Sequence, residues 1–227
     1  MSPPDATPPK HALPARPLTE RGLARAVRAL TTLDADLAQV VERFGRPPLW
    51  GRATGFATLI HIILEQQVSL ASARAAFDRL AAAAPVTPEN FLSFDDAALL
   101  AIGFSRQKAA YGRGLARALG SGQLDLVALE RLDDDQARAA LVALKGVGPW
   151  TADIYLLLAL RRPDVWPVGD IALVQAVTEV KRLAQRPTAE AMETLGEAWR
   201  PWRAVAARVL WHYYLKTPRR KASKGDD

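Results

Sequence analysis

The chain has 227 residues, 49% of them hydrophobic, and 30 lysines and arginines against 24 aspartates and glutamates give it a net charge of +6. This length can bury a sizeable core in one large or two small domains, and the basic bias favours a polyanionic partner such as nucleic acid. The absence of cysteine excludes disulfides, thiolate zinc sites, a cysteine nucleophile and any cysteine-ligated iron–sulfur cluster.

The two ends of the chain differ in composition from the rest. Residues 1–18 are rich in proline and lack an apolar core, which predicts a disordered arm rather than a signal peptide or lipid anchor. Residues 217–227 form a basic tail. No apolar run reaches the length of a membrane span. We therefore expect an intracellular protein with no membrane partner, located in the cytoplasm and nucleoid of a bacterium or in the nucleus of a eukaryote.

From residue 19 onward, apolar residues recur at three- and four-residue spacings, which predicts an all-α protein. Prolines and glycines separate these periodic stretches, and strand-type alternation is absent. We expect two helical lobes with a groove between them, an inner lobe of about 50–145 and a second lobe from 19–49 and 146–216. The predicted helices cover 19–31, 34–44, 54–67, 69–83, 105–119, 134–144, 149–161, 171–184, 188–199 and 202–216.

The segment from Leu144 to Ala152 places Gly146 and Gly148 between two predicted helices. Such a turn leaves backbone N–H groups unpaired at the start of the second helix, where the helix dipole is positive, so the turn can hold a phosphate oxygen. The glycines could also form only a turn and a helix C-cap. The longer pattern favours phosphate binding, because Leu144 can anchor the first helix and Ala152 allows close helix packing. The candidate DNA contacts here are Gly146, Val147, Gly148 and Thr151.

Asp170 follows the turn after one predicted helix and a short loop. It precedes the expected helix 171–184, where aspartate is a favoured N-cap, and it can be both a cap and a reactive carboxylate. A carboxylate that faces a phosphate-binding hairpin can stabilise an oxocarbenium-like sugar as a base departs, or orient the attacking water. Asp153 is the rival acid, which we interpret as a surface or capping residue.

The hairpin followed by a loop that ends in Asp170 resembles the helix-hairpin-helix DNA glycosylases, and Trp150-Thr151-Ala152 is similar to the 3-methyladenine DNA glycosylase II group. Members that also cut the DNA backbone carry a Schiff-base lysine where this chain has Trp150, and neither Lys145 nor Lys108 matches that position. The resemblance therefore implies a glycosylase without lyase activity. The lack of cysteine excludes the iron–sulfur branch of the family.

The resemblance runs from about residue 50 to residue 214. Three further segments match the family, in the order in which the family has them. Residues 64–69 resemble the loop that fills the duplex where a base is flipped out, 102–109 resemble a second turn before a long helix, and 199–211 resemble the final helix. The resemblance adds Gln66, Gln67 and Val68 to the candidate DNA contacts, with Gln67 or Val68 as the wedge.

The resemblance also implies a base pocket lined by Trp150, Ile154 and Trp211. N-alkylated purines carry positive charge, so an indole face attracts them more than it attracts a neutral base. Both tryptophans could instead belong to the core. A structural monovalent or divalent cation is implied at the hairpin, bound by the backbone carbonyls of Val142, Leu144 and Val147, and no other cofactor is required.

These features predict a monomeric, monofunctional DNA N-glycosylase of base excision repair. It would flip alkylated purines of the 3-methyladenine or 7-methylguanine type out of double-stranded DNA and leave an abasic site. The alternatives are a related glycosylase for oxidised, deaminated or mismatched bases, and a non-catalytic DNA-binding protein in which Asp170 is only a cap. Residues 1–49 are too short and too helical for the N-terminal β-domain of some family members.

Overall fold

The computed structural model describes residues 16–218, so the predicted arm and basic tail lie, apart from their innermost residues, outside the described range. Within this range the protein contains helices and no strand, which confirms the all-α prediction, and no helix is long and apolar enough to cross a membrane. The helices are α1 (Glu20–Leu33), α2 (Ala35–Phe44), α3 (Phe56–Glu65), α4 (Leu70–Ala83), α5 (Pro88–Ser93), α6 (Asp96–Ile102), α7 (Arg106–Gly120), α8 (Leu126–Leu129), α9 (Asp134–Val142), α10 (Pro149–Leu158), α11 (Ile171–Val180), α12 (Ala189–Glu197) and α13 (Arg203–Lys216).

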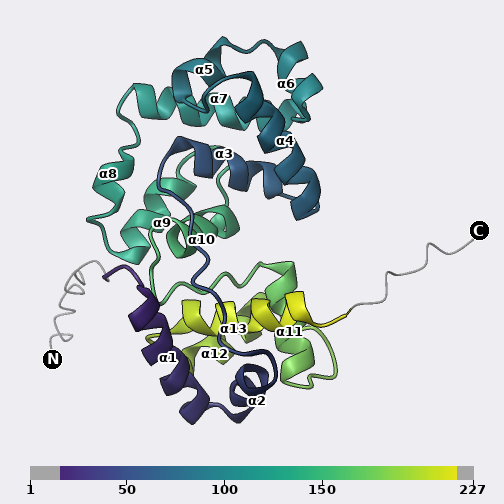
Figure 1. Cartoon of the computed structure of the whole chain (residues 1–227). Coiled ribbons are helices and arrows are strands. Elements are labelled where there is room, and N and C mark those ends of the chain that lie inside the picture. The colour runs from purple at the N-terminus through teal and green to yellow at the C-terminus, as the bar shows by residue number, and fades with distance from the viewer. Residues whose placement is uncertain (1–15, 219–227) are drawn as a thin grey trace, which may run out of the picture.

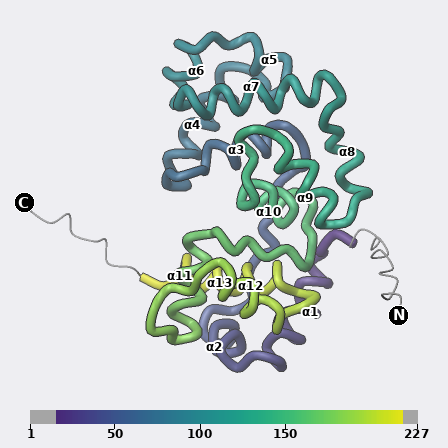
Figure 2. The backbone as a smooth tube through the Cα atoms, turned by 180° about the vertical axis from the view of Figure 1, so that it is seen from behind, coloured from purple at the N-terminus to yellow at the C-terminus, as the bar shows by residue number. Residues whose placement is uncertain are grey.

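The helices form two groups, as the two opposite views in Figures 1 and 2 show. One group contains α3 to α10, and the other contains α1, α2 and α11 to α13. The main helix contacts fall within these groups: α3 packs on α4, α7 and α10, whereas α13 packs on α1, α2 and α11. Helix α10 also packs on α9, so it belongs to the first group. The sequence prediction placed residues 146–216, which include α10, in the second lobe.

Most helices begin where the sequence supplies a short polar side chain. All except α3, α10 and α13 start after a serine, threonine or aspartate whose side chain accepts a hydrogen bond from a backbone N–H group of the first turn. Such caps stabilise a helix by about 1 kcal/mol and satisfy one of its unpaired donors. The start of α10 lacks this arrangement, so its first N–H groups remain open to a partner outside the helix.

Two stretches of backbone between the groups are tied to the end of α10. The N–H group of Leu18 donates to the carbonyl of Arg161 at 2.7 Å, and the N–H group of Arg52 donates to the carbonyl of Leu158 at 2.9 Å. The buried Tyr155 hydroxyl accepts from the N–H group of Gly55 at 3.0 Å. These bonds bring the segment that precedes α3 alongside α10 and hold the two groups close together.

The structure adds three short helices, α5, α6 and α8, that the sequence did not predict. They are four to seven residues long and therefore too short to show a helical periodicity. The helix predicted over 54–67 ends at Glu65, because Gln67 adopts a left-handed backbone conformation with φ of 57°.

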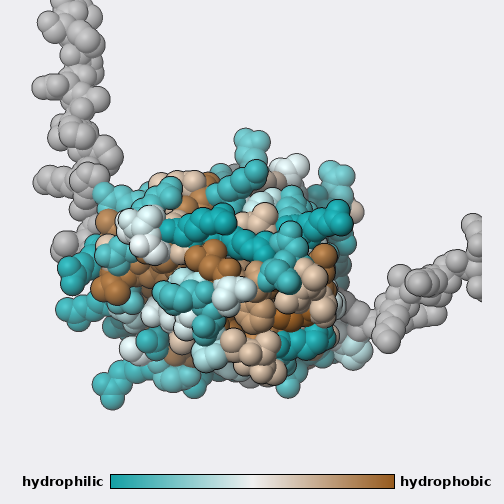
Figure 3. Space-filling view, turned by 90° about the horizontal axis from the view of Figure 1, so that it is seen from above, coloured by the Kyte–Doolittle hydropathy of each residue, from teal (hydrophilic) through white to brown (hydrophobic). Residues whose placement is uncertain are grey.

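The outer end of the first group has a mixed surface. In the view from above, hydrophilic side chains surround small hydrophobic groups (Figure 3). Leu92 and Leu100 are among the exposed apolar residues on α5 and α6. Scattered apolar side chains of this kind are normal on a protein surface and do not indicate a binding site.

Candidate active site

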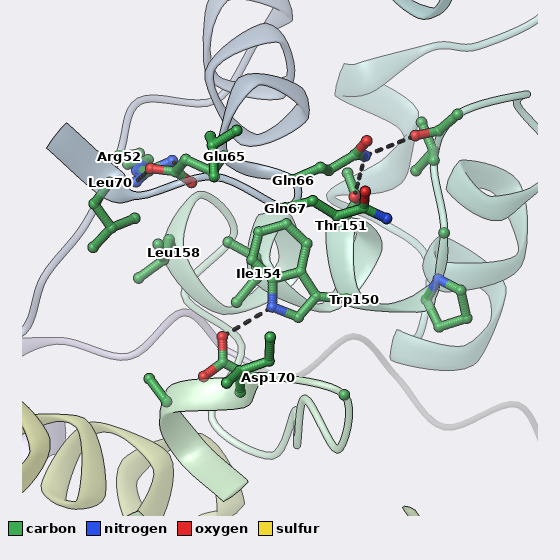
Figure 4. A pocket seen from close by; sticks show the side chains of 18 of the residues that line it. Arg52, Glu65, Gln66, Gln67, Leu70, Trp150, Thr151, Ile154, Leu158 and Asp170 are labelled. Carbon is green, nitrogen blue, oxygen red and sulfur yellow. Dashed lines mark hydrogen bonds and ion pairs between the residues drawn. The ribbon is translucent and has the colours of Figure 1, made fainter. Parts of the chain in front are cut away.

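A cavity of about 1440 Å³ lies between the two groups of helices. Its walls come from the α3–α4 loop, the turn between α9 and α10, the start of α10, the residues around the start of α11, and α13 (Figure 4). The structure brings to this one cavity every residue that the sequence put forward as a site residue: Gln66, Gln67, Val68, Val142, Leu144, Gly146, Val147, Gly148, Trp150, Thr151, Ile154, Asp170 and Trp211.

The Asp170 carboxylate accepts hydrogen bonds from three N–H donors. Its Oδ1 accepts from the backbone N–H of Leu173 at 2.8 Å, which caps α11, and from Trp211 Nε1 at 3.0 Å. Its Oδ2 accepts from Trp150 Nε1 at 2.9 Å (Figure 4). An ionised carboxylate has acceptor atoms and no donor. A set of three N–H donors therefore suits a negatively charged carboxylate in the cavity wall. Asp170 is therefore both a helix cap and a group that faces the cavity.

The hydrogen bonds to Asp170 also orient the two indole rings. Trp150 and Trp211 are half-buried and line the cavity rather than filling the core. Ile154 is buried beside Trp150 and contributes an apolar surface. Trp50, which no sequence motif singled out, adds a third indole to the cavity from the loop before α3. Nothing in its local pattern distinguishes it from a core tryptophan.

The turn between α9 and α10 has the geometry of an anion-binding hairpin. Gly146 has a φ of 92°, and a Cβ atom there would lie 2.1 Å from Cγ of Tyr111, so the position requires glycine for two separate reasons. Gly148 is exposed, and a Cβ atom there would have no neighbour within 4 Å. Because the N-cap residue Gly148 supplies no side-chain cap to α10, the N-terminus of this helix presents N–H groups and a positive dipole to solvent.

Gln66 joins the α3–α4 loop to this hairpin. Its Nε2 donates to the carbonyl of Gly146 and to Oγ1 of Thr151, both at 2.9 Å (Figure 4). Lys108 holds the same loop from α7, because its Nζ donates to the carbonyls of Leu64 at 2.7 Å and of Gln66 at 2.8 Å. Burial lowers the pKa of Lys108. Gln66 and Thr151, put forward as DNA contacts, thus bind each other and fix the hairpin against the loop.

The interpretation of Asp153 as a surface or capping residue is wrong. Asp153 is buried and pairs with Arg138, whose Nε lies 2.7 Å from its Oδ1. Burial raises the pKa of Asp153, against the opposing effect of Arg138. Asp153 does not line the cavity, so it is part of a structural ion pair between α9 and α10.

The carbonyls named as cation ligands lie in the hairpin, but part of their bonding capacity is used within the protein. The carbonyl of Leu144 accepts a hydrogen bond from the N–H group of Val147 at 3.0 Å. A carbonyl oxygen has a second lone pair, so this bond leaves room for a cation. Across residues 16–218, no group of three or more histidine, aspartate or glutamate side chains could hold a metal ion.

The cavity also contains a charged pair that no motif in the sequence predicts. Arg52, in the loop before α3, donates through Nη1 to Glu65 Oε2 at 3.0 Å and through Nη2 to Glu65 Oε1 at 2.6 Å. Both side chains line the cavity, on the side away from Asp170 in Figure 4. The two residues lie 13 positions apart across a loop, and no helical or strand spacing joins them.

This fold and this cavity define a helical protein with a glycine-containing hairpin beside an acidic, aromatic site. Residues 60–201 match the HhH-GPD superfamily of base excision DNA repair proteins, and the chain belongs to that family.

Relatives and solved structures agree with this membership. DNA-3-methyladenine glycosylase 1 of Schizosaccharomyces pombe is 29% identical over 197 residues, which cover 83% of this chain and 86% of that protein. The solved structure of the 3-methyladenine DNA glycosylase Mag1 of S. pombe in complex with abasic DNA superimposes with a TM-score of 0.78, at 29% identity, and covers 82% of this chain and 95% of that one. A DNA-3-methyladenine glycosidase from Bacillus halodurans gives a TM-score of 0.72 at 29% identity and covers 86% of this chain and 90% of that one.

Other relatives are longer than this chain. It spans 64%, 35% and 41% of the length of three bacterial relatives that it matches.

Proposed function

We propose that this protein is a monofunctional DNA N-glycosylase that removes alkylated purines from double-stranded DNA and leaves an abasic site. The observation that carries the proposal is the Asp170 carboxylate, held by two indole N–H groups in a cavity beside the uncapped start of α10. The names of the S. pombe relative and of the two solved structures support the same chemistry. A DNA-binding protein without activity would need the hairpin but not this cavity.

Different residues bind the DNA backbone, fill the gap in the duplex and hold the base. The hairpin N–H groups at Gly148 and α10 bind a phosphate of the DNA backbone, and Gln67 or Val68, exposed on the α3–α4 loop, fills the space left by the flipped nucleotide. The faces of Trp150 and Trp211 hold the cationic base by cation–π attraction. This attraction favours N-alkylated purines over neutral bases.

The chemistry needs no acid to protonate the base. When the bond between C1′ and the base nitrogen breaks, its electron pair neutralises the positive charge of a 3-methyladenine or 7-methylguanine, which leaves as a neutral base. The Asp170 carboxylate stabilises the oxocarbenium-like sugar, and water adds to C1′ and loses a proton. A cation bound by the carbonyls of Val142, Leu144 and Val147 would stiffen the hairpin and take no part in this step.

The test is base release from a panel of duplexes that each carry one lesion: 3-methyladenine, 7-methylguanine, hypoxanthine, ethenoadenine or uracil. We expect release of the two cationic bases with abasic strands that stay intact until heat or alkali treatment. Release of only hypoxanthine or uracil would favour a related glycosylase for deaminated lesions. Tight binding without release of any base would favour a DNA-binding protein. Sedimentation of the protein alone should give a monomer.

A further inference from the structure

The Arg52–Glu65 pair lies in an unfavourable position for a merely structural ion pair. The Glu65 side chain is 5% exposed and the Arg52 side chain 25% exposed. Glu65 is the last residue of α3, where the negative end of the helix dipole disfavours a carboxylate. A buried ion pair of this kind typically contributes no more stability than an apolar pair of similar volume. Stability therefore gives little reason for its presence.

The pair is charge-balanced by itself. His61 Nε2 lies 3.7 Å from Glu65 Oε1, but burial lowers the pKa of the imidazole, so His61 is neutral at pH 7. Arg52 is the cation that balances Glu65. The pair thus presents a neutral wall with adjacent donor and acceptor atoms, rather than a net negative charge that would attract any cationic base.

On the cavity side, apolar side chains adjoin the pair. Leu70 and Leu158 line the cavity near it (Figure 4), and the backbone of Arg52 is fixed by its hydrogen bond to the carbonyl of Leu158. A rigid polar pair in an apolar wall is a typical arrangement for orienting a ligand in a pocket. Trp150 and Trp211 cannot supply this function, because the single N–H group of each indole is already bound to Asp170.

We propose that Arg52 and Glu65 read the edge of the flipped base and select 6-aminopurines over 6-oxopurines. Each Glu65 oxygen uses one lone pair for Arg52 and keeps another that can accept from an exocyclic amino group. The guanidinium keeps N–H donors for the neighbouring ring nitrogen. At this edge 3-methyladenine presents the amino donor beside the acceptor N7, whereas 7-methylguanine presents the O6 acceptor beside a methylated N7 that can no longer accept. The inference rests on the proposed glycosylase function.

The experiment uses the full chain and duplex DNA treated with dimethyl sulfate, from which 3-methyladenine and 7-methylguanine release is measured in one reaction. The double variant Arg52→Met/Glu65→Leu removes the pair and keeps its volume. We expect release of 3-methyladenine to fall by about tenfold or more, the scale of one two-point base contact, while release of 7-methylguanine stays unchanged.

The matched control is Arg138→Met/Asp153→Leu. It removes a pair of similar burial, with side chains 29% and 8% exposed, that does not line the cavity. We expect this variant to keep the wild-type ratio of the two released bases. A second variant, Glu65→Gln, tests the inference independently of the apolar replacement: the amide adds a donor, so the ratio should shift toward 7-methylguanine.

Three results would overturn the inference. The first is an unchanged release ratio in both Arg52/Glu65 variants, and the second is an equal loss of both bases, which would make the pair a structural part of the cavity. The third is an equal change of the ratio in the Arg138/Asp153 control. Failure of the wild-type protein to release either base would instead contradict the proposed function.

Discussion

At the scale of single residues, the Asp170 carboxylate combines capping with a place in the cavity wall. The same Oδ1 that caps α11 also accepts from Trp211, while Oδ2 holds Trp150. The helix, the two pocket walls and the charge are therefore positioned together. This arrangement explains how an N-cap aspartate, common on many helices, can serve chemistry without losing its structural role.

Asp170→Asn should separate the two roles. Asparagine is as good an N-cap as aspartate and its single oxygen can keep the Oδ1 contacts, so the fold and DNA binding should persist. The negative charge and the acceptor for Trp150 are lost, and excision should fall by about 100- to 1,000-fold. Single-turnover excision and binding to an undamaged duplex measure the two effects. Asp95→Asn, at the N-cap of α6, is the matched control. Undiminished excision by the Asp170→Asn variant would exclude Asp170 as the reactive acid.

Because position 150 carries a tryptophan and not a lysine, we expect the protein to lack lyase activity. A lyase needs an amine that attacks C1′ to form a Schiff base, and Trp150 carries instead an indole N–H that is bound to Asp170. Borohydride should therefore trap no covalent DNA adduct with the native protein. Trp150→Lys should slow excision, because it removes the indole from the cavity. A strong trapped complex from the native protein would contradict the monofunctional mechanism and point to Lys145, which also lines the cavity.

At the scale of elements, the hairpin provides two glycines with different requirements. A side chain at Gly146 collides with Tyr111 and meets an unfavourable backbone, so its substitution disturbs the fold. Gly148 has free space around it and an extended backbone, so we expect a side chain there to leave the fold intact and to block the approach of the proposed phosphate. Gly148 is therefore the informative position for testing DNA contact.

Gly148→Leu should weaken binding to damaged and undamaged duplexes alike, because a contact between the backbone and a phosphate reads no sequence. Fluorescence anisotropy at several salt concentrations measures the affinity, which should fall as salt rises. Gly114→Leu is the control, since Gly114 is an exposed glycine of α7 with equally free space. A change in lesion preference with unchanged affinity for undamaged DNA would show that the hairpin is not the phosphate clamp.

The sequence predicted features that depend on neighbouring residues, but not contacts between residues that lie far apart in the chain. Helix periodicity and the local hairpin pattern identified the fold and the turn, and the resemblance supplied the order of the site segments. The Gln66–Thr151 bond and the Arg52–Glu65 pair join parts of the chain through the tertiary fold, so no local spacing could reveal them. The interpretation of Asp153 failed for the same reason, because its burial and its pairing with Arg138 arise from the packing of α10 on its neighbouring helices.

At the scale of the whole molecule, Arg208 links the two groups of helices. It lies on α13, is fully buried, and donates through Nη2 to the carbonyl of Leu157 near the end of α10 at 2.9 Å. Its Nε and Nη1 have no hydrogen-bond partner, and burial lowers its pKa to about 10. Arg162 is also buried but donates to three carbonyls, those of Leu129, Glu130 and Leu132. The two arginines therefore differ in how well their charge is compensated.

Arg208→Met should raise the stability of the protein. The substitution removes an uncompensated buried charge at the cost of one hydrogen bond, which we expect to stabilise the fold by about 1 to 3 kcal/mol. Because the folded pKa of Arg208, about 10, lies below its value in the unfolded chain, the penalty is complete below about pH 10 and is relieved as the pH rises above 10. The difference between variant and wild type in urea unfolding should therefore be constant from pH 7 to 9 and shrink above about pH 10. Arg162→Met should destabilise the protein at pH 8, because it leaves three carbonyls without their donor and Asp134 without the arginine that it pairs with. A loss of stability in Arg208→Met at pH 8 would mean that its bond to Leu157 outweighs the cost of the buried charge.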